Sequence, residues 1–319
     1  MNALPNWLVD ILKAHRDAYS PIWRGFLSDH LPMAAMALWH VGVSKRDIQS
    51  WIARYQQQLE PMPSKSPHVD HPEGVWGSLD AYGGLLRFFD QELDQLGETA
   101  VLDRYLPSLI SGWVSDAFHP LIRLSYGRRF GCSSEISAGL AYLTARGPNR
   151  QLEYVAQRAT SGEVRWPGHV AIEGSTFDER VNQYLTLHTP EVRIPADPVA
   201  AYASDVLDIL NTSHHFFALH LVTALHAFVT ATRGLQGVGP DILAAGLTVG
   251  YAAAGFPPFE REASPTPFRT DFEHDVKLAF ACDDYAKSSG NEKYRTAATV
   301  FGEALPSITD GIAQIPSAS

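Results

Sequence analysis

Several of the thirteen histidines stand in apolar, helical surroundings where an imidazole is unusual. His30 opens a predicted helix and is followed by apolar residues at i+4, i+8 and i+11, which places it on the core-facing side. His119 precedes Pro120, a residue suited to the first position of a helix, so it falls at a junction between helices. Either one alone is ordinarily a buried, hydrogen-bonded core residue. A group of them indicates a metal site, because imidazole binds iron, zinc, copper or nickel.

Two more histidines share one predicted helix, over residues 215–232. His220 and His226 lie roughly 120° apart around its axis and about 9 Å apart along it. They cannot chelate one ion as an i, i+4 pair. One of them is a candidate metal ligand, and the other is a candidate to orient substrate or to support a ligand. Thr223 lies midway between them and is, with His226 and Lys277, a candidate catalytic residue.

His274 and Lys277 are the most informative pair. They stand at i, i+3 and therefore share one helix face. Lys277 carries the only charge in residues 276–281, and a buried lysine usually has a shifted pKa or a chemical role. The alternatives are that Lys277 extends to solvent or pairs with Asp284.

The elements that must position these residues are predominantly helical. Short alternation of apolar and polar residues occurs only over 163–171, so one small β-hairpin is the most that we expect. We predict an all-α fold, with residues 1–319 as a single compact domain whose core spans about 15–304. Spacing of three and four between apolar residues predicts helices over 31–42, 46–58, 79–97, 101–117, 120–127, 134–145, 196–211, 215–232, 240–254, 271–287 and 293–304.

Composition excludes several classes of function. A net charge of −10 without a basic run argues against nucleic acid and anionic membranes as partners. The most apolar stretch, residues 242–256, falls short of the ~20 residues of a membrane span and is predicted to be a buried helix. Cys132 and Cys282 are isolated, which fits a reducing, cytoplasmic location. The oligomeric state is left open.

Four short strings resemble the questin oxidase-like family and occur in the family's order. The likeness extends over about residues 15–300, and the region 83–143 also reads like the family's middle. The strings are Asp-His-Leu-Pro-Met-Ala from Asp29, Phe-His-Pro-Leu-Ile-Arg-Leu-Ser-Tyr from Phe118, Leu-His-Leu-Val-Thr-Ala-Leu-His-Ala from Leu219 and Glu-His-Asp-Val-Lys-Leu from Glu273.

The resemblance implies an oxidoreductase that uses O₂. Family members from fungal secondary metabolism open a ring of anthraquinones, a Baeyer–Villiger-like outcome, at a non-haem iron held by histidines and a carboxylated lysine. It therefore implies a mono- or dioxygenase that holds Fe(II) and acts on an aromatic or quinone-type small molecule. The candidate ligands carried over to this chain are His30, His119, His220 or His226, His274 and, as the modified lysine, Lys277.

The resemblance also bears on NADPH binding and on the aromatic residues near the motifs. NADPH use has been proposed in the family, but this chain has no GxGxxG, and its nearest run, residues 234–239, follows a helix. Aromatic residues near the motifs are expected either to wall a flat substrate or to be plain core: Trp39, Trp113, Phe118, Tyr126, Phe216 and Phe217.

Two other functions are weighed against the oxygenase. His274-Asp275 in a helical protein is compatible with a metal-dependent phosphohydrolase, although Asp275 should point about 100° away from His274. The chain is also compatible with a non-catalytic, helical small-molecule-binding protein. Solvent-facing His274 and Lys277 would favour that last alternative, whereas a cavity shared with His30 and His119 would favour the oxygenase.

Overall fold

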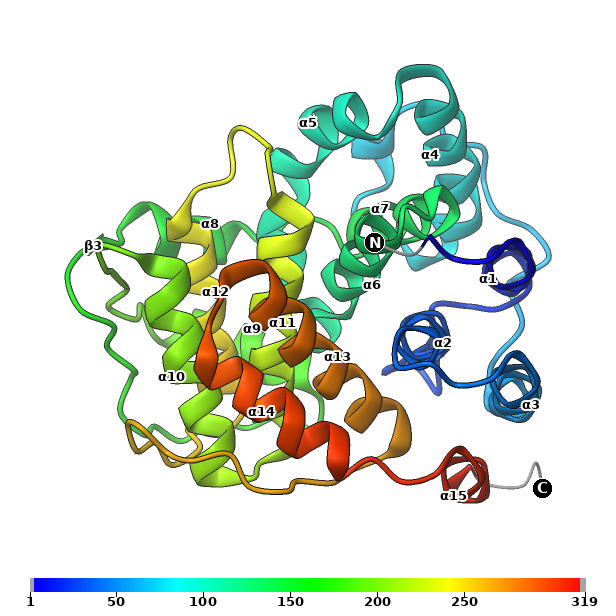
Figure 1. Ribbon diagram of the computed structural model, residues 1–319. Helices are drawn as coiled ribbons and strands as arrows, with labels where there is room; N and C mark the ends of the chain where they lie inside the picture. The colour runs from blue at the N-terminus through cyan, green and yellow to red at the C-terminus, as the bar shows by residue number, and fades with distance from the viewer. Residues whose placement is uncertain (1–2, 316–319) are drawn as a thin grey trace.

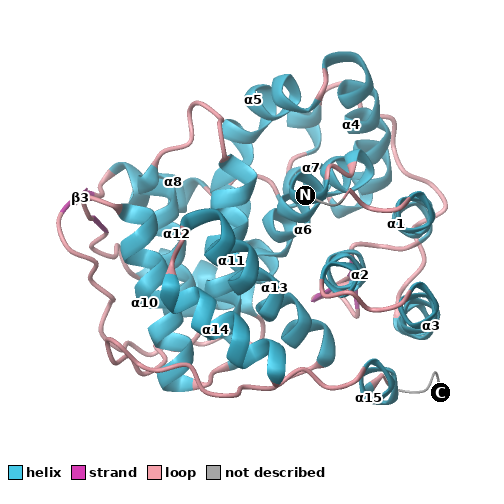
Figure 2. Ribbon diagram, viewed as in Figure 1, coloured by secondary structure: helices cyan, strands magenta, loops and turns pink. Residues whose placement is uncertain are grey.

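The computed structural model describes residues 3–315 as a predominantly helical fold (Figures 1 and 2). The α-helices are α1 (Asn6–Ala18), α2 (Leu31–His40), α3 (Lys45–Tyr55), α4 (Tyr82–Leu96), α5 (Glu98–Leu109), α6 (His119–Phe130), α7 (Ser133–Arg146), α8 (Arg150–Gln157), α9 (Phe177–Leu187), α10 (Pro198–Ser213), α11 (Phe216–Thr232), α12 (Pro240–Ala253), α13 (Phe272–Ser289), α14 (Glu292–Glu303) and α15 (Ile308–Gln314). Short 3₁₀ segments are η1 (Gln56–Gln58), η2 (Pro72–Val75), η3 (Leu79–Ala81) and η4 (Ile110–Phe118). The predicted all-α class is confirmed.

Four helices that are far apart in the sequence form a closed ring of contacts. Helix α2 packs on α6, α6 on α11, α11 on α13, and α13 returns to α2. Around this ring, α1, α3 and α15 gather on one side, α4, α5 and α7 above it, and α8, α9, α10, α12 and α14 on the other side (Figure 1). The ring matters because each of its members carries one of the candidate histidines.

Side-chain caps explain where several helices begin. The hydroxyl of Ser44 accepts from the backbone N–H of Asp47 at the start of α3. Thr176 and Glu179 form a capping box at the start of α9, and the side chain of Asn149 caps α8. Neither α8 nor α9 was predicted, because their caps lie at the ends of stretches that resemble loops. Helices α1 and α15 were not predicted either.

The strands are few and short. Strand β1 (Ile22–Trp23) pairs antiparallel with β2 (Leu27–Ser28), and Ile22 lies opposite Ser28. Strand β3 (Thr160–Ser161) pairs parallel with β4 (Arg193–Ile194). The single hairpin therefore lies at residues 22–28 and not at 163–171, where the expected alternation forms no strand. Alternation over so few residues is weak evidence, because a loop crossing a protein surface also buries side chains intermittently.

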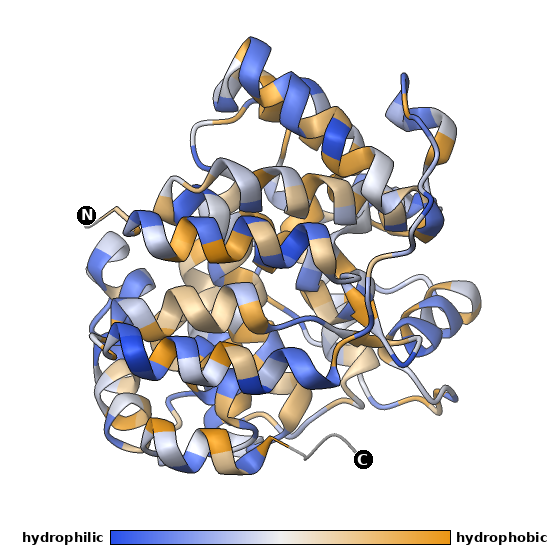
Figure 3. Ribbon diagram, turned by 90° about the vertical axis from the view of Figure 1, so that its right-hand side faces the viewer, coloured by the Kyte–Doolittle hydropathy of each residue, from blue (hydrophilic) through white to orange (hydrophobic). Residues whose placement is uncertain are grey.

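Buried apolar residues form one continuous core from Leu4 to Ile315 (Figure 3 shows the apolar stripes of the helices). The single-domain assignment stays a prediction. Helix α12, expected to be buried, packs so closely that a Cβ at Gly246 would lie 2.2 Å from the Trp113 ring. Among the described residues, no helix is both long and apolar enough to cross a membrane.

Candidate functional site

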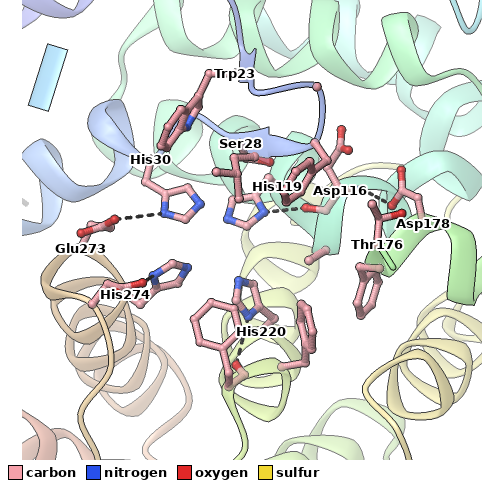
Figure 4. A pocket seen from close by; sticks show the side chains of 18 of the residues that line it. Trp23, Ser28, His30, Asp116, His119, Thr176, Asp178, His220, Glu273 and His274 are labelled. Carbon is pink, nitrogen blue, oxygen red and sulfur yellow. Dashed lines mark hydrogen bonds and ion pairs between the residues drawn. The ribbon is translucent and has the colours of Figure 1, made fainter. Parts of the chain in front are cut away.

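Four of the candidate histidines meet where the helices of the ring begin. His30 is the N-cap of α2, and His119 is the first residue of α6. His220 and His274 lie in the opening turns of α11 and α13. All four are buried and point toward a common space (Figure 4). Helix geometry thus brings together side chains that the sequence separates by up to 244 positions.

The distances between three of the rings are compatible with one shared ion. One ring nitrogen from each of His30, His119 and His274 lies within 4.8 Å of the others. Nitrogens bound at about 2.1 Å to one ion lie about 3–4.2 Å apart, so these three residues need only small side-chain movements to share an ion. His220 is outside that group, and its ring centroid lies 5.3 Å from that of His119 and 5.1 Å from that of His274.

Hydrogen bonds orient two of the imidazoles. Nδ1 of His119 donates to the backbone carbonyl of Asp116 at 2.5 Å, and Nδ1 of His220 donates to that of Phe216 at 3.2 Å. The proton on Nδ1 leaves the lone pair of each ring on Nε2, as a metal ligand requires, and that of His119 faces Nζ of Lys277. Nδ1 of His30 and both ring nitrogens of His274 have no hydrogen-bond partner although they are buried. Such groups are costly to leave unsatisfied, which fits residues that bind a metal.

Burial keeps these imidazoles neutral. Burial, and then the charge of Lys277, lowers the pKa of His220 to about 3. The same causes lower the pKa values of His30, His119 and His274 well below the usual value. Neutral imidazole is the form that can donate a lone pair to a metal.

Lys277 lies behind the histidines and is 1% exposed. Its Nζ lies 3.4 Å from Nε2 of His119, and no carboxylate of residues 3–315 forms an ion pair with it. Burial lowers the pKa of Lys277 to about 7, against the opposing effect of Glu273 and Asp29. The burial of Lys277 excludes the solvent-exposed alternative. A pair with Asp284 is also excluded, because Asp284 binds Arg129 and His226.

One carboxylate at the site was not predicted. Oε1 of Glu273 lies 3.9 Å from Nδ1 of His30, and burial raises the pKa of Glu273 to about 7. Asp271, Glu273 and His274 also form a group whose ligand atoms are close enough for one ion. The signal available in the sequence was the Glu-His pair at the start of α13.

The histidines border a cavity of about 620 Å³. The hairpin β1–β2 and the first turns of α9, α11 and α13 contribute to its wall. Both polar and apolar side chains line it, among them Trp23, Phe26, Ser28, Tyr55, Asp116, Thr176, Phe177, Asp178, Phe216 and Phe217. This volume is within the range of small-molecule sites.

The wall beside His119 contains an unusual turn. Asp116, Ala117 and Phe118 all have positive φ, at 49°, 51° and 71°. Left-handed backbone costs a non-glycine residue on the order of 1–2 kcal/mol, so three in a row need support from their surroundings. The Asp116 carboxylate is bound by two guanidinium nitrogens of Arg146, and its backbone N–H donates to Oδ1 of Asp178 at 2.6 Å.

His226 and Thr223 are not brought to this site. Nε2 of His226 lies 3.0 Å from Oδ2 of Asp284, whose other oxygen binds Arg129. The hydroxyl of Thr223 donates to carbonyls of its own helix, at Leu219 and His220. Neither residue lines the cavity. The helical spacing that separates His220 from His226 directs them to different neighbours, so the geometry supports neither a ligand role for His226 nor a catalytic role for Thr223.

Of the six aromatic residues expected either to wall a substrate or to be plain core, two line the cavity and four do not. Phe216 and Phe217 line the cavity, whereas Trp113, Phe118 and Tyr126 are buried in the core. Trp39 packs against Trp7. Proximity to a motif along the chain was a poor guide, because successive helical residues face different directions. The aromatic residues that the prediction lacked are Trp23, Phe26, Tyr55 and Phe177.

Comparison with known proteins gives the family of the chain. Residues 27–214 match the questin oxidase-like family. The chain belongs to that family. A Baeyer–Villiger oxidase of Pestalotiopsis fici is 22% identical over 240 residues, which cover 62% of this chain and 54% of the relative. The questin oxidase of Aspergillus terreus is 25% identical over 150 residues, covering 42% and 34%.

The family match and the site overlap only in part. The matched range includes His30 and His119, whereas His220, His274 and Lys277 follow its end. The alignment spans about half the length of the first relative and about a third of the second. Membership therefore supports the class of protein, and the grouping of the last three side chains depends on the geometry.

Proposed function

We propose that the protein is a non-haem, iron-dependent oxygenase that acts on an aromatic or quinone-type small molecule. The observation that carries this proposal is the convergence of four neutral imidazoles on one cavity, with buried Lys277 against His119 and in no ion pair among the described residues. Relatives named as a Baeyer–Villiger oxidase and a questin oxidase support the oxidative class. By analogy with those names, a ring-opening, Baeyer–Villiger-like oxidation is the reaction we propose.

The residues present fit a bound iron. His30, His119, His220 and His274 would hold it through ring nitrogens, and Fe(II) would supply the binding and activation of O₂. Imidazole is the ligand type that Fe(II) shares with zinc and copper, so the donor set agrees with iron without excluding the other two. Glu273, which borders the cavity near His30, is a further candidate ligand.

Lys277 is suited to carboxylation. A pKa lowered to about 7 keeps much of its amine neutral near neutral pH. A neutral Nζ can form a bond to the carbon of CO₂ and lose a proton, which leaves a carbamate with a negative charge and two oxygens. A protonated ammonium has no lone pair and can bind no metal. We propose that Lys277 is a ligand in this carbamate form.

The cavity is suited to a flat, partly polar substrate. Phe177, Phe216 and Phe217 offer apolar surface, and Ser28, Thr176 and Asp178 offer polar groups. Burial and the neighbouring Asp116 raise the pKa of Asp178 to about 7, so near neutral pH its carboxyl can either donate to or accept from a phenol. Acidic residues outnumber Arg146 in the lining, which disfavours phosphorylated substrates.

The other two functions are less well supported. In a phosphohydrolase, Asp275 should join the histidines, but its Oδ1 accepts from the backbone N–H and the hydroxyl of Thr270. A non-catalytic binding protein would not require four buried histidines without carboxylate hydrogen bonds. NADPH, the reductant that the family resemblance suggests, finds no dinucleotide-binding motif in this sequence.

Metal content tests the proposal. Protein purified without chelators should contain iron in near-stoichiometric amount by mass spectrometry, and Lys277→Ala should lose most of it. Intact mass under native conditions, with and without bicarbonate, should show the mass of one added CO₂ in the wild type only. If anaerobic incubation with ferrous iron leaves the folded wild type without metal, the oxygenase proposal is wrong and a binding protein becomes the better conclusion.

A further inference from the structure

We infer that Arg146 is a positioning residue for His119, acting through the left-handed turn 116–118. Arg146 binds the Asp116 side chain, and the Asp116 carbonyl in turn accepts the proton on Nδ1 of His119. That His119 binds a metal is the proposed function, on which this inference depends for its consequence. The tautomer of His119 can be measured without any metal.

The turn is what aims the Asp116 carbonyl. Chain direction changes abruptly between η4 and α6, and the three left-handed residues make that change. The Asp116 carbonyl accepts from the backbone N–H of His119 and also faces Nδ1 of its ring at 2.5 Å. The tautomer of His119 therefore depends on the turn.

Two contacts from other helices maintain the turn. Arg146, at the end of α7, holds both oxygens of the Asp116 carboxylate, a bidentate arrangement that fixes direction as well as distance. Asp178, in the first turn of α9, accepts from the Asp116 backbone N–H. The side chain, the backbone N–H and the backbone carbonyl of Asp116 therefore all have hydrogen-bond partners. The Asp116 side chain is 4% exposed, so solvent cannot readily replace these partners.

Loss of Arg146 should release the turn. Without the guanidinium, the buried carboxylates of Asp116 and Asp178 face each other with no cation between them, which favours separation of the two residues. The Asp116 carbonyl then no longer holds the proton on Nδ1, and His119 can place it on Nε2, the atom that faces Lys277. A ring protonated on Nε2 cannot bind a metal through that atom.

Nitrogen NMR of metal-free protein labelled with ¹⁵N-histidine tests the inference. The wild-type resonances of His119, identified by their absence in His119→Gln, should be those of a ring protonated on Nδ1. In Arg146→Met these should move toward the other tautomer, and ferrous affinity should fall about 10–100-fold, as for the loss of other groups that orient a ligand. Arg146→Lys, which keeps the charge but not the bidentate bond, should lie between the two.

Arg129→Met is the matched control. The Arg129 side chain is 16% exposed and that of Arg146 is 21%, and each binds one buried aspartate. Arg129→Met should lower stability but leave the His119 resonances and the iron affinity unchanged. Unchanged His119 resonances in folded Arg146→Met would overturn the inference, as would an equal shift in Arg129→Met. If the wild type binds no iron but Arg146→Met still changes the tautomer, the proposed function fails and the positioning role stands. Should Arg146→Met not fold, Arg146→Lys and Asp178→Leu provide the same readout.

Discussion

Two buried histidine regions lie on the same helix and differ in how they are partnered. His226, on α11, binds Asp284, which also binds Arg129, so every charge in that region has an opposite neighbour. His220, two turns earlier, faces other imidazoles and Lys277. In the first region, the side chains of His226, Asp284 and Arg129 find their partners within the protein. The second leaves lone pairs unused beside a cavity, as expected of groups that bind something else.

The difference shows which histidines to select in a chain with many. Burial alone does not distinguish the regions, since His220 and His226 are both 2% exposed. The distinguishing property is whether a carboxylate sits within hydrogen-bond distance of the ring. The predictions below test that distinction, beginning with the largest expected effect.

Replacing one unpaired histidine should remove the metal without harming the fold. We expect His274→Leu to lower iron affinity by at least about 100-fold, more than the loss of an orienting group does. The unfolding free energy should stay level or rise, because neither ring nitrogen of His274 makes a hydrogen bond. Metal titration and denaturant unfolding would measure both quantities. His226→Leu should instead lower the unfolding free energy and leave the iron affinity unchanged. An equal loss of metal in both variants would show that the two histidine regions do not differ in this way.

Replacing the paired carboxylate should destabilise the protein. Asp284→Asn is expected to lower the unfolding free energy by about 2 kcal/mol at pH 7, less than the 3–5 kcal/mol of fully buried pairs because its partner Arg129 is partly exposed. Hydrogen bonds and charge from His226 and Arg129 hold the pKa of Asp284 below its usual range despite burial. The stabilisation is therefore present above the unfolded-state pKa of about 3.9 and is lost as the pH falls below it. Urea unfolding from pH 7 to 3 should show the two proteins converging.

Replacing the buried lysine should stabilise the metal-free protein. The pKa of Lys277 is about 7 in the native state, against about 10.4 in an unfolded chain. Between these values the unfolded chain holds a proton that the native protein lacks, so wild-type stability rises with pH. Lys277→Met should be more stable by at least about 1 kcal/mol at pH 7, and this advantage should shrink as the pH approaches 10. An advantage independent of pH would mean that the amine stays charged in the native state.

The smallest effect should come from Thr223. Its hydroxyl bonds only to carbonyls of its own helix. Thr223→Val should therefore change the unfolding free energy by less than about 1 kcal/mol and turnover by less than about a factor of three. Steady-state kinetics would check this, with Thr230→Val as a control near His226. A large fall in turnover would restore a catalytic role for Thr223.

Much of the fold followed from local pattern, and the site did so only in part. Apolar spacing identified the four helices of the ring because each buries a face against its neighbours. It missed α1, α8, α9 and α15, which are short or lie on the outside of the molecule. The sequence marked the candidate histidines as unusual residues, and the fold brings four of them together (Figure 4), while their role as ligands stays a prediction. The choice between His220 and His226 could not be made, because it depends on Asp284 and Arg129, which only the fold brings near.

The turn at 116–118 could not be predicted from the local sequence pattern. Nothing in Asp-Ala-Phe indicates three consecutive left-handed residues, since Ala and Phe do not favour that conformation and Asp adopts it only as a single residue. The turn exists because Arg146 and Asp178 act on Asp116 from two other helices. Its place before His119 could be found only from coordinates.

The ring of helices also bears on the order in which the protein assembles. Its four histidines come from positions as early as 30 and as late as 274, so no fragment ending before α13 contains the whole set. Local helices can form early, but contacts between such distant segments close late, after much loop entropy has been lost. A chain still being synthesised would lack the complete set of four histidines, so under the proposed function its metal site would form only after α13 has been made.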